Sequence, residues 1–106
     1  MQKLKQTVIL SGSRNEVATL KLEKKMSGVV GELKVYNLRE DNGLVLGIDI
    51  NDVITKKEVA LKNNIYNFKL KDASNLDNIS AILVRREDDN YKPIMWCKKK
   101  NKTLCY

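Results

Sequence analysis

The sequence predicts an all-β protein, an antiparallel and immunoglobulin-like β-sandwich of about seven or eight strands. Three observations lead to this prediction. Short segments in which apolar and polar residues alternate with a period of two recur along the whole chain. Turn-forming residues separate these segments at intervals of about ten residues. No long stretch shows the period of 3.6 residues that an amphipathic helix requires. A small Greek-key barrel is the alternative architecture compatible with this pattern.

The first half of the chain contains four expected strands. Residues 7–10 form a short apolar run that ends at the Ser-Gly-Ser turn of residues 11–13. Residues 17–26 alternate, with leucines on one face and charged residues on the other. Residues 31–38 and 43–50 also alternate, and the loop between them ends in Asn-Gly, which tolerates the positive φ of hairpin turns. We therefore expect these two strands to pair as a β-hairpin.

The second half contains four more expected strands. Residues 58–62 alternate, and the Asn-Asn pair after them supplies a tight turn before residues 66–71. Residues 79–86 are apolar on both faces, so this strand is expected to be central and covered on both sides. Residues 91–97 contain a proline, which cannot donate to a sheet hydrogen bond, so this strand is expected to lie at an edge or to begin after the proline.

The faces assigned in this way predict a buried core. Gly47 lies on the face of its strand opposite to the core residues, where its lack of a side chain leaves room for a bulky neighbour. Leu76, in the loop before the strand at residues 79–86, is expected to lie under the sheet. The residues expected to be largely buried are Leu33, Val35, Leu46, Ile48, Phe68, Leu70, Ile82, Val84 and Trp96.

The length of 106 residues fits one domain, for which we expect residues 1–97, followed by a lysine-rich C-terminal tail at 98–106. The net charge is +7, but Lys98, Lys99, Lys100 and Lys102 supply more than half of it. The remaining chain is therefore close to balanced, which argues against a basic nucleic-acid site on the domain itself. No apolar run reaches the ~7–15 residues of a signal peptide or the ~20 of a membrane span. We expect a cytoplasmic protein.

The sequence offers little to catalysis, so we expect a protein that is not an enzyme and that needs no cofactor or metal. It contains no histidine, the commonest general base, and its glycines match no phosphate-binding motif. The segment DINDV at residues 49–53 begins like a calcium loop, but it lacks the required glycine and places valine at a ligand position. We interpret it, and the acidic segment REDD at residues 86–89, as solvated turns.

The two cysteines, Cys97 and Cys105, leave three possibilities open. They can be two reduced thiols, as is usual in a cytosolic protein, and this is the interpretation that we favour. They can form a redox pair whose thiolates are stabilised by the neighbouring lysines. They can also bind a metal, which would need further ligands from a second chain.

The order GELKVYNL, GLVLGI, EVALKNNIYNFKL, NISAILV and KPIMW resembles a small β-sandwich module of uncharacterised bacterial proteins. The resemblance covers residues 17–96. It implies a sandwich fold and, because that module has no assigned activity, it transfers no functional residue. The lysine-rich end has no counterpart in the module.

These observations favour a non-enzymatic binding or interaction module for an unidentified protein partner, because sandwiches present edge strands and loops to partners. Lysines on outward positions have a simpler interpretation, since they also keep sheet edges from pairing with other chains. The alternative is weak, sequence-independent binding of nucleic acid or an anionic surface. The residues expected to carry it are Lys98, Lys99, Lys100 and Lys102.

Overall fold

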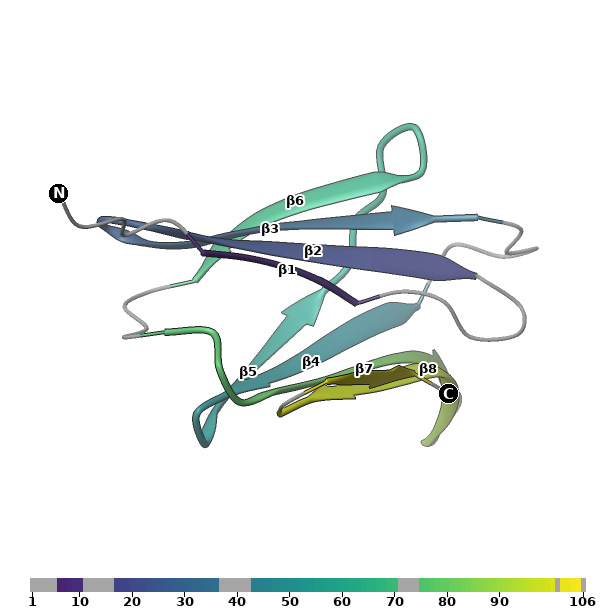
Figure 1. Ribbon diagram of the computed structural model, residues 1–106. Coiled ribbons are helices and arrows are strands. Elements are labelled where there is room, and N and C mark those ends of the chain that lie inside the picture. The colour runs from purple at the N-terminus through teal and green to yellow at the C-terminus, as the bar shows by residue number, and fades with distance from the viewer. Residues whose placement is uncertain (1–5, 11–16, 37–42, 71–74, 101, 106) are drawn as a thin grey trace, which may run out of the picture.

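Two antiparallel β-sheets pack face to face in the computed structural model, which describes residues 6–10, 17–36, 43–70, 75–100 and 102–105 (Figure 1). Sheet A has the strand order β1-β2-β3-β6, and sheet B has the order β5-β4-β7-β8-β9. None of the described residues is helical, so the prediction of an all-β sandwich is confirmed. The strands are β1 (Gln6–Leu10), β2 (Ala18–Lys25), β3 (Gly28–Val35), β4 (Leu44–Ile50), β5 (Val53–Glu58), β6 (Ile65–Leu70), β7 (Ile79–Glu87), β8 (Asn90–Lys99) and β9 (Thr103–Cys105).

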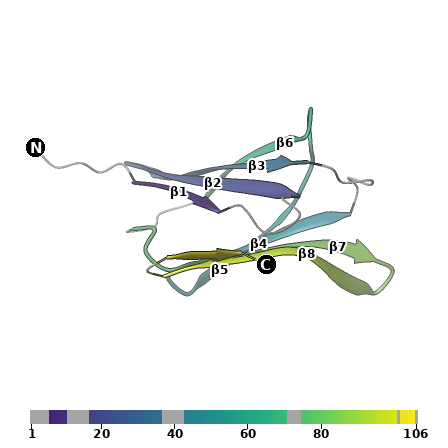
Figure 2. The ribbon, with the colours of Figure 1, turned by 45° about the vertical axis from the view of Figure 1, so that its right-hand side comes forward.

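The order of the central strands is of the immunoglobulin type. The groups β2-β3-β6 and β5-β4-β7-β8 correspond to strands A-B-E and C′-C-F-G of that architecture, with β1 and β9 added at the edges. The two layers remain separate in both views of the ribbon (Figures 1 and 2). No described strand of one sheet pairs with a described strand of the other, so the two sheets do not close into the small Greek-key barrel that was the alternative.

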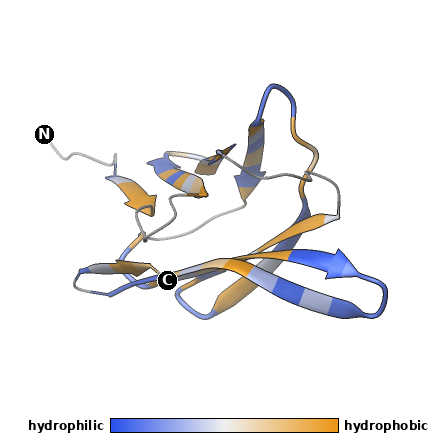
Figure 3. Cartoon of the chain, turned by 90° about the vertical axis from the view of Figure 1, so that its right-hand side faces the viewer, coloured by the Kyte–Doolittle hydropathy of each residue, from blue (hydrophilic) through white to orange (hydrophobic). Residues whose placement is uncertain are grey.

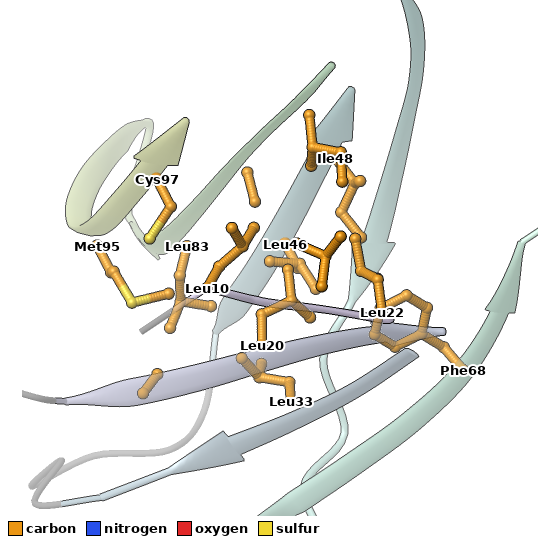
Figure 4. Packing of buried hydrophobic residues seen from close by; sticks show 14 of the residues in the cluster. Leu10, Leu20, Leu22, Leu33, Leu46, Ile48, Phe68, Leu83, Met95 and Cys97 are labelled. Atoms are coloured by element: carbon orange, nitrogen blue, oxygen red, sulfur yellow. The ribbon is translucent and has the colours of Figure 1, made fainter. Parts of the chain in front are cut away.

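The predicted hairpin of residues 31–38 and 43–50 is wrong. The strands β3 and β4 lie in different sheets, where β3 pairs with β2 and β6 and β4 pairs with β5 and β7. Their apolar faces meet across the core instead, as Leu33 and Leu46 show (Figure 4). Gly43 has the positive φ expected of it, 71°, but residues 39–42 lie outside the described part of the chain, as does the turn expected at 11–13.

Other turns follow the sequence prediction closely. Asn51 and Asp52 have φ values of 51° and 72° and join β4 to β5 in a two-residue turn, as expected for the DINDV segment. Asn63 and Asn64, with φ values of 54° and 66°, form a second turn of this kind. Asp88, with φ at 54°, lies in the turn between β7 and β8, and the exposed tip of that hairpin is hydrophilic (Figure 3). Short polar side chains tolerate this left-handed backbone, which explains why these turns were predictable.

The core is formed by the facing sides of both sheets, and it confirms five of the nine predicted core residues. Leu33, Val35, Leu46, Ile48 and Phe68 are buried, and so is Leu76. The other buried hydrophobic residues are Val8, Leu10, Ala18, Leu20, Leu22, Val29, Leu44, Ile50, Val59, Ile79, Ala81, Leu83, Met95 and Cys97.

The prediction is wrong for Ile82 and Trp96, which are 37% and 41% exposed, while Leu70 and Val84 are only half-buried. Because Met95 pairs with Leu83 and Cys97 pairs with Ala81, these four side chains face the core. The alternation of a strand then turns Ile82 and Trp96 outward, side by side. A shift in register between Leu83 and Val84 places Pro93 opposite Val84 on the same outer face.

Gly31 is required by the packing of Phe68. The two residues are cross-strand partners, and a Cβ atom at position 31 would overlap with the Phe68 ring. The ring also stacks on Tyr66, with 5.3 Å between the ring centroids. Phe68 therefore covers the β3 backbone directly at the end of the core (Figure 4).

Gly31→Ala is expected to lower the free energy of unfolding by about 1–3 kcal/mol, because the added methyl group forces the Phe68 ring out of its place. Gly47→Ala is the matched control, since the nearest atom to its new Cβ is the Cγ2 of Ile82 at 3.3 Å, which can move. It should change the stability by less than about 1 kcal/mol. Urea denaturation followed by far-ultraviolet circular dichroism measures both, and equal losses would contradict this account of Gly31.

Candidate functional site

The outer face of sheet B carries contiguous apolar residues that the described part of the chain leaves partly exposed. In the central cross-strand row, Gly47 of β4, Ile82 of β7 and Trp96 of β8 are direct neighbours. In the next row, Val45, Val84 and Pro93 are neighbours in the same way. We call these six residues the apolar patch: Val45, Gly47, Ile82, Val84, Pro93 and Trp96.

Charged and apolar residues border the apolar patch. One flanking row runs across all five strands and consists of Ile54, Asp49, Ser80, Lys98 and Leu104. On the side of β5, Lys56 and Glu58 continue the two patch rows. An apolar centre with a charged rim is the usual composition of a protein–protein interface.

The outer face of sheet A differs in character. Its rows mix charges at close spacing, for example Lys21 beside Glu32. The ion pair between Lys25 and Glu23, with 3.6 Å from Nζ to Oε1, lies on this face. Such a face is well solvated, so the asymmetry between the two sheets singles out sheet B.

A hollow of about 380 Å³ lies next to the apolar patch, at the end of sheet B that carries the β4–β5 turn. It brings together Lys98, Lys99 and Lys100, three of the four lysines that the sequence singled out. Acidic and amide side chains share the hollow, so its charge is mixed rather than purely basic. The other lining residues are Asp49, Asn51, Asp52, Asn78, Ile79 and Ser80.

The lysines do not form the free tail expected at residues 98–106. Lys98 and Lys99 belong to β8, and residues Thr103–Cys105 form β9, which pairs with β8. The Nζ of Lys99 donates to the carbonyl oxygens of Leu76 and Asp77, at 3.3 and 3.5 Å. Sheet B therefore continues through the boundary expected at residue 97, and the fourth lysine, Lys102, is exposed in the connection between the two strands.

Cys97 and Cys105 are joined by a disulfide, so the expectation of two reduced thiols is wrong. They are direct cross-strand partners, with their Cα atoms 4.1 Å apart. Cys97 is fully buried in the core, and Cys105 packs against that core at its margin. The disulfide thus anchors β9, a strand of only three residues, to the body of the fold.

Comparisons with protein-family models, with curated proteins and with solved structures found no significant match. The resemblance of residues 17–96 to the bacterial sandwich module therefore remains an expectation. Within the described ranges, no group of three or more carboxylate or thiol side chains is placed to hold a metal ion. The same residues contain no helix long and apolar enough to cross a membrane.

The sequence pattern alone does not reveal the apolar patch, although two features of it point there. The strand at residues 79–86 is apolar on both faces, which predicted a cover on both sides, and Gly47 was recognised as a place that admits a bulky neighbour. Only the pairing of the strands brings these residues together with Trp96.

Removal of the disulfide by Cys105→Ser is expected to lower the free energy of unfolding by about 2–3 kcal/mol, because the bond closes a short loop and restricts the unfolded chain. Thr103→Ala, an exposed substitution in the same strand, is the control and should have little effect. Urea denaturation of the oxidised and the reduced protein measures the difference. Stability that is indifferent to a thiol reductant, or two titratable thiols in the native oxidised protein, would contradict this role.

Proposed function

We propose that the protein is a non-enzymatic binding module that recognises a protein partner through the apolar patch on the outer face of sheet B. The observation that supports the proposal most directly is the exposure of Ile82 and Trp96, at 37% and 41%, side by side in one row. Neither residue belongs to the buried core formed by the described residues, and both side chains keep solvent-exposed area.

The composition of the patch suits recognition. Tryptophan is among the residues that contribute most to binding when a partner covers them, and here it lies in an apolar surface with charges around it. Burial of apolar area contributes roughly 25 cal/mol per Å², so cover over Trp96 and Ile82 would give a substantial gain. The rim charges of Asp49 and Lys98 would then set the orientation of the partner.

Strand addition at an edge is supported less well. The strand β5 forms one edge of sheet B, and it carries Lys56 and Lys57 next to exposed Val53 and Ile54. Lysines along an edge disfavour pairing with another chain. At the opposite edge, β9 covers the C-terminal part of β8 and is fixed there by the disulfide.

A photo-reactive amino acid at position 82 is expected to form protein adducts in the cells that naturally produce the protein, because position 82 lies at the centre of the proposed binding face. The same amino acid at position 21, an exposed place on the outer face of sheet A, is the control and should form few adducts. Denaturing electrophoresis and mass spectrometry identify the products. No adduct from position 82, or equal adducts from both positions, would refute the proposed binding face.

The second candidate function is weak binding of nucleic acid or of an anionic surface by Lys98, Lys99, Lys100 and Lys102. The observation that favours it is that three of these lysines gather around one hollow. Asp49 and Asp52 line the same hollow and would repel phosphate groups, which is why we rank this function second.

This candidate makes a definite prediction for single-stranded DNA. Binding should not depend on base sequence, and the logarithm of the affinity should fall against the logarithm of the salt concentration with a slope no steeper than about −3 for four cations. Replacing Lys98, Lys100 and Lys102 by glutamine should flatten that slope in a fluorescence titration. The control replaces Lys21, Lys25 and Lys34, which are exposed on sheet A, by glutamine. An equal effect of both triple variants would exclude a local site.

The disulfide also bears on the compartment in which the module works. Disulfides persist in oxidising compartments and are rare in the cytosol. The bond between Cys97 and Cys105 therefore supports a location in an oxidising compartment, in place of the cytoplasm expected from the sequence.

A further inference from the structure

We propose that the partner on the outer face of sheet B is a second copy of this chain, in a two-fold dimer whose axis runs parallel to β7 between the two facing sheets. The inference rests on the proposed function, since it names the partner of the same apolar patch. Three properties of that face lead to it: its symmetry about β7, the sizes of its side chains and its dimensions.

The row that crosses all five strands is self-complementary about β7. From β5 to β9 it consists of Ile54, Asp49, Ser80, Lys98 and Leu104, so an apolar residue and a charge lie on each side of a central serine. A two-fold axis parallel to β7 brings each residue of the row opposite the partner's residue that lies equally far from β7 on the other side. Asp49 then faces Lys98 of the second copy, and the exposed side chains of Ile54 and Leu104 cover each other.

Within one chain, Asp49 and Lys98 are not direct cross-strand neighbours. They lie on β4 and β8 with β7 between them, so their backbones are about 10 Å apart across the sheet and their side chains point away from it in parallel. Across a dimer interface the sheets are also about 10 Å apart, but the two side chains point toward each other. A lysine and an aspartate bridge that distance, and the contact forms twice because the axis repeats it.

In the central row of the patch, the sizes of the side chains on the two sides of β7 are complementary. Gly47 and Trp96 lie on either side of Ile82, so the axis places the indole of each copy over the glycine of the other. Ile82 leans over one side of Gly47, where its Cγ2 lies 3.3 Å from the place of a Cβ atom, and a larger residue at position 47 would fill the remaining space. At the axis itself, Ile82 meets Ile82 and forms an apolar centre.

The dimensions of the face also suffice. Five strands at a spacing of about 4.8 Å span roughly 20 Å, and the part of β7 from Ser80 to Val84 spans roughly 15 Å at about 3.3 Å per residue. A contact of this size lies at the small end of specific interfaces and fits a weak dimer that forms at the upper protein concentrations. The face carries both signs of charge, in Asp49, Glu58, Lys56 and Lys98, so the net charge of +7 does not concentrate at the contact.

The test uses charge reversal and its rescue between two variants of the full chain. Sedimentation velocity from about 1 μM to 1 mM should show wild-type protein at twice the 12.1 kDa mass of the chain at the upper concentrations. Asp49→Lys and Lys98→Asp should each weaken self-association by about tenfold or more, because like charges then face each other twice. An equimolar mixture of the two variants should restore the dimer, since every lysine again faces an aspartate.

Lys21→Glu, on the outer face of sheet A, is the matched control and should leave self-association unchanged. Circular dichroism of each variant verifies that the fold is intact. If the wild-type protein is a monomer over the whole concentration range, the dimer proposal is wrong. Adducts of another protein at position 82 would in that case still support the proposed binding face. A dimer that the two reversals do not weaken, or that mixing does not restore, would show that copies of the chain meet through a different surface.

Discussion

The pairing of β7 with β8 is the constraint on which the rest of the structure depends. Leu83 lies opposite Met95 and Ala81 lies opposite Cys97, so these four side chains enter the core. Because successive residues of a strand point to opposite faces, the same pairing turns Ile82, Trp96 and Lys98 outward. A slip of one residue would exchange the two sets and would expose the disulfide-bonded cysteine.

The register between β7 and β8 therefore determines both the position of the disulfide and the composition of the outer face. Cys97 can reach Cys105 because both point toward the interior from adjacent strands. The bond keeps β9 in place, and β9 in turn supplies Leu104 to the outer face and covers part of the edge of β8. The C-terminal segment thus contributes to stability through the inner side of sheet B and to the proposed binding face through its outer side.

The outer faces of the two sheets differ in how their charged residues are placed. The outer face of sheet A places opposite charges beside each other and needs no partner to satisfy them. The outer face of sheet B separates Asp49 from Lys98 by one strand and fills the centre with apolar groups. Burial of such a surface is favourable, and the symmetry of its charges about β7 is the reason why we propose a second copy of the chain as the partner.

The sequence by itself determined the fold class, most of the strands and most turns. The strand that it predicted at residues 58–62 is wrong, since only Glu58 belongs to a strand and Lys62 forms an isolated bridge, and the strands β5 and β9 were not predicted. Period-two alternation requires no knowledge of neighbouring strands, and residues such as Asn51 and Asn63 adopt left-handed backbone for local steric reasons. The tertiary structure decided which strands are neighbours, so β3 and β4 lie in different sheets although their sequence resembles a hairpin. It also decided which apolar face is inward when both faces of a strand are apolar, as for Ile82 and Trp96, and it joined Cys97 to Cys105. These outcomes depend on contacts between residues far apart in the chain, which alternation within one strand does not encode.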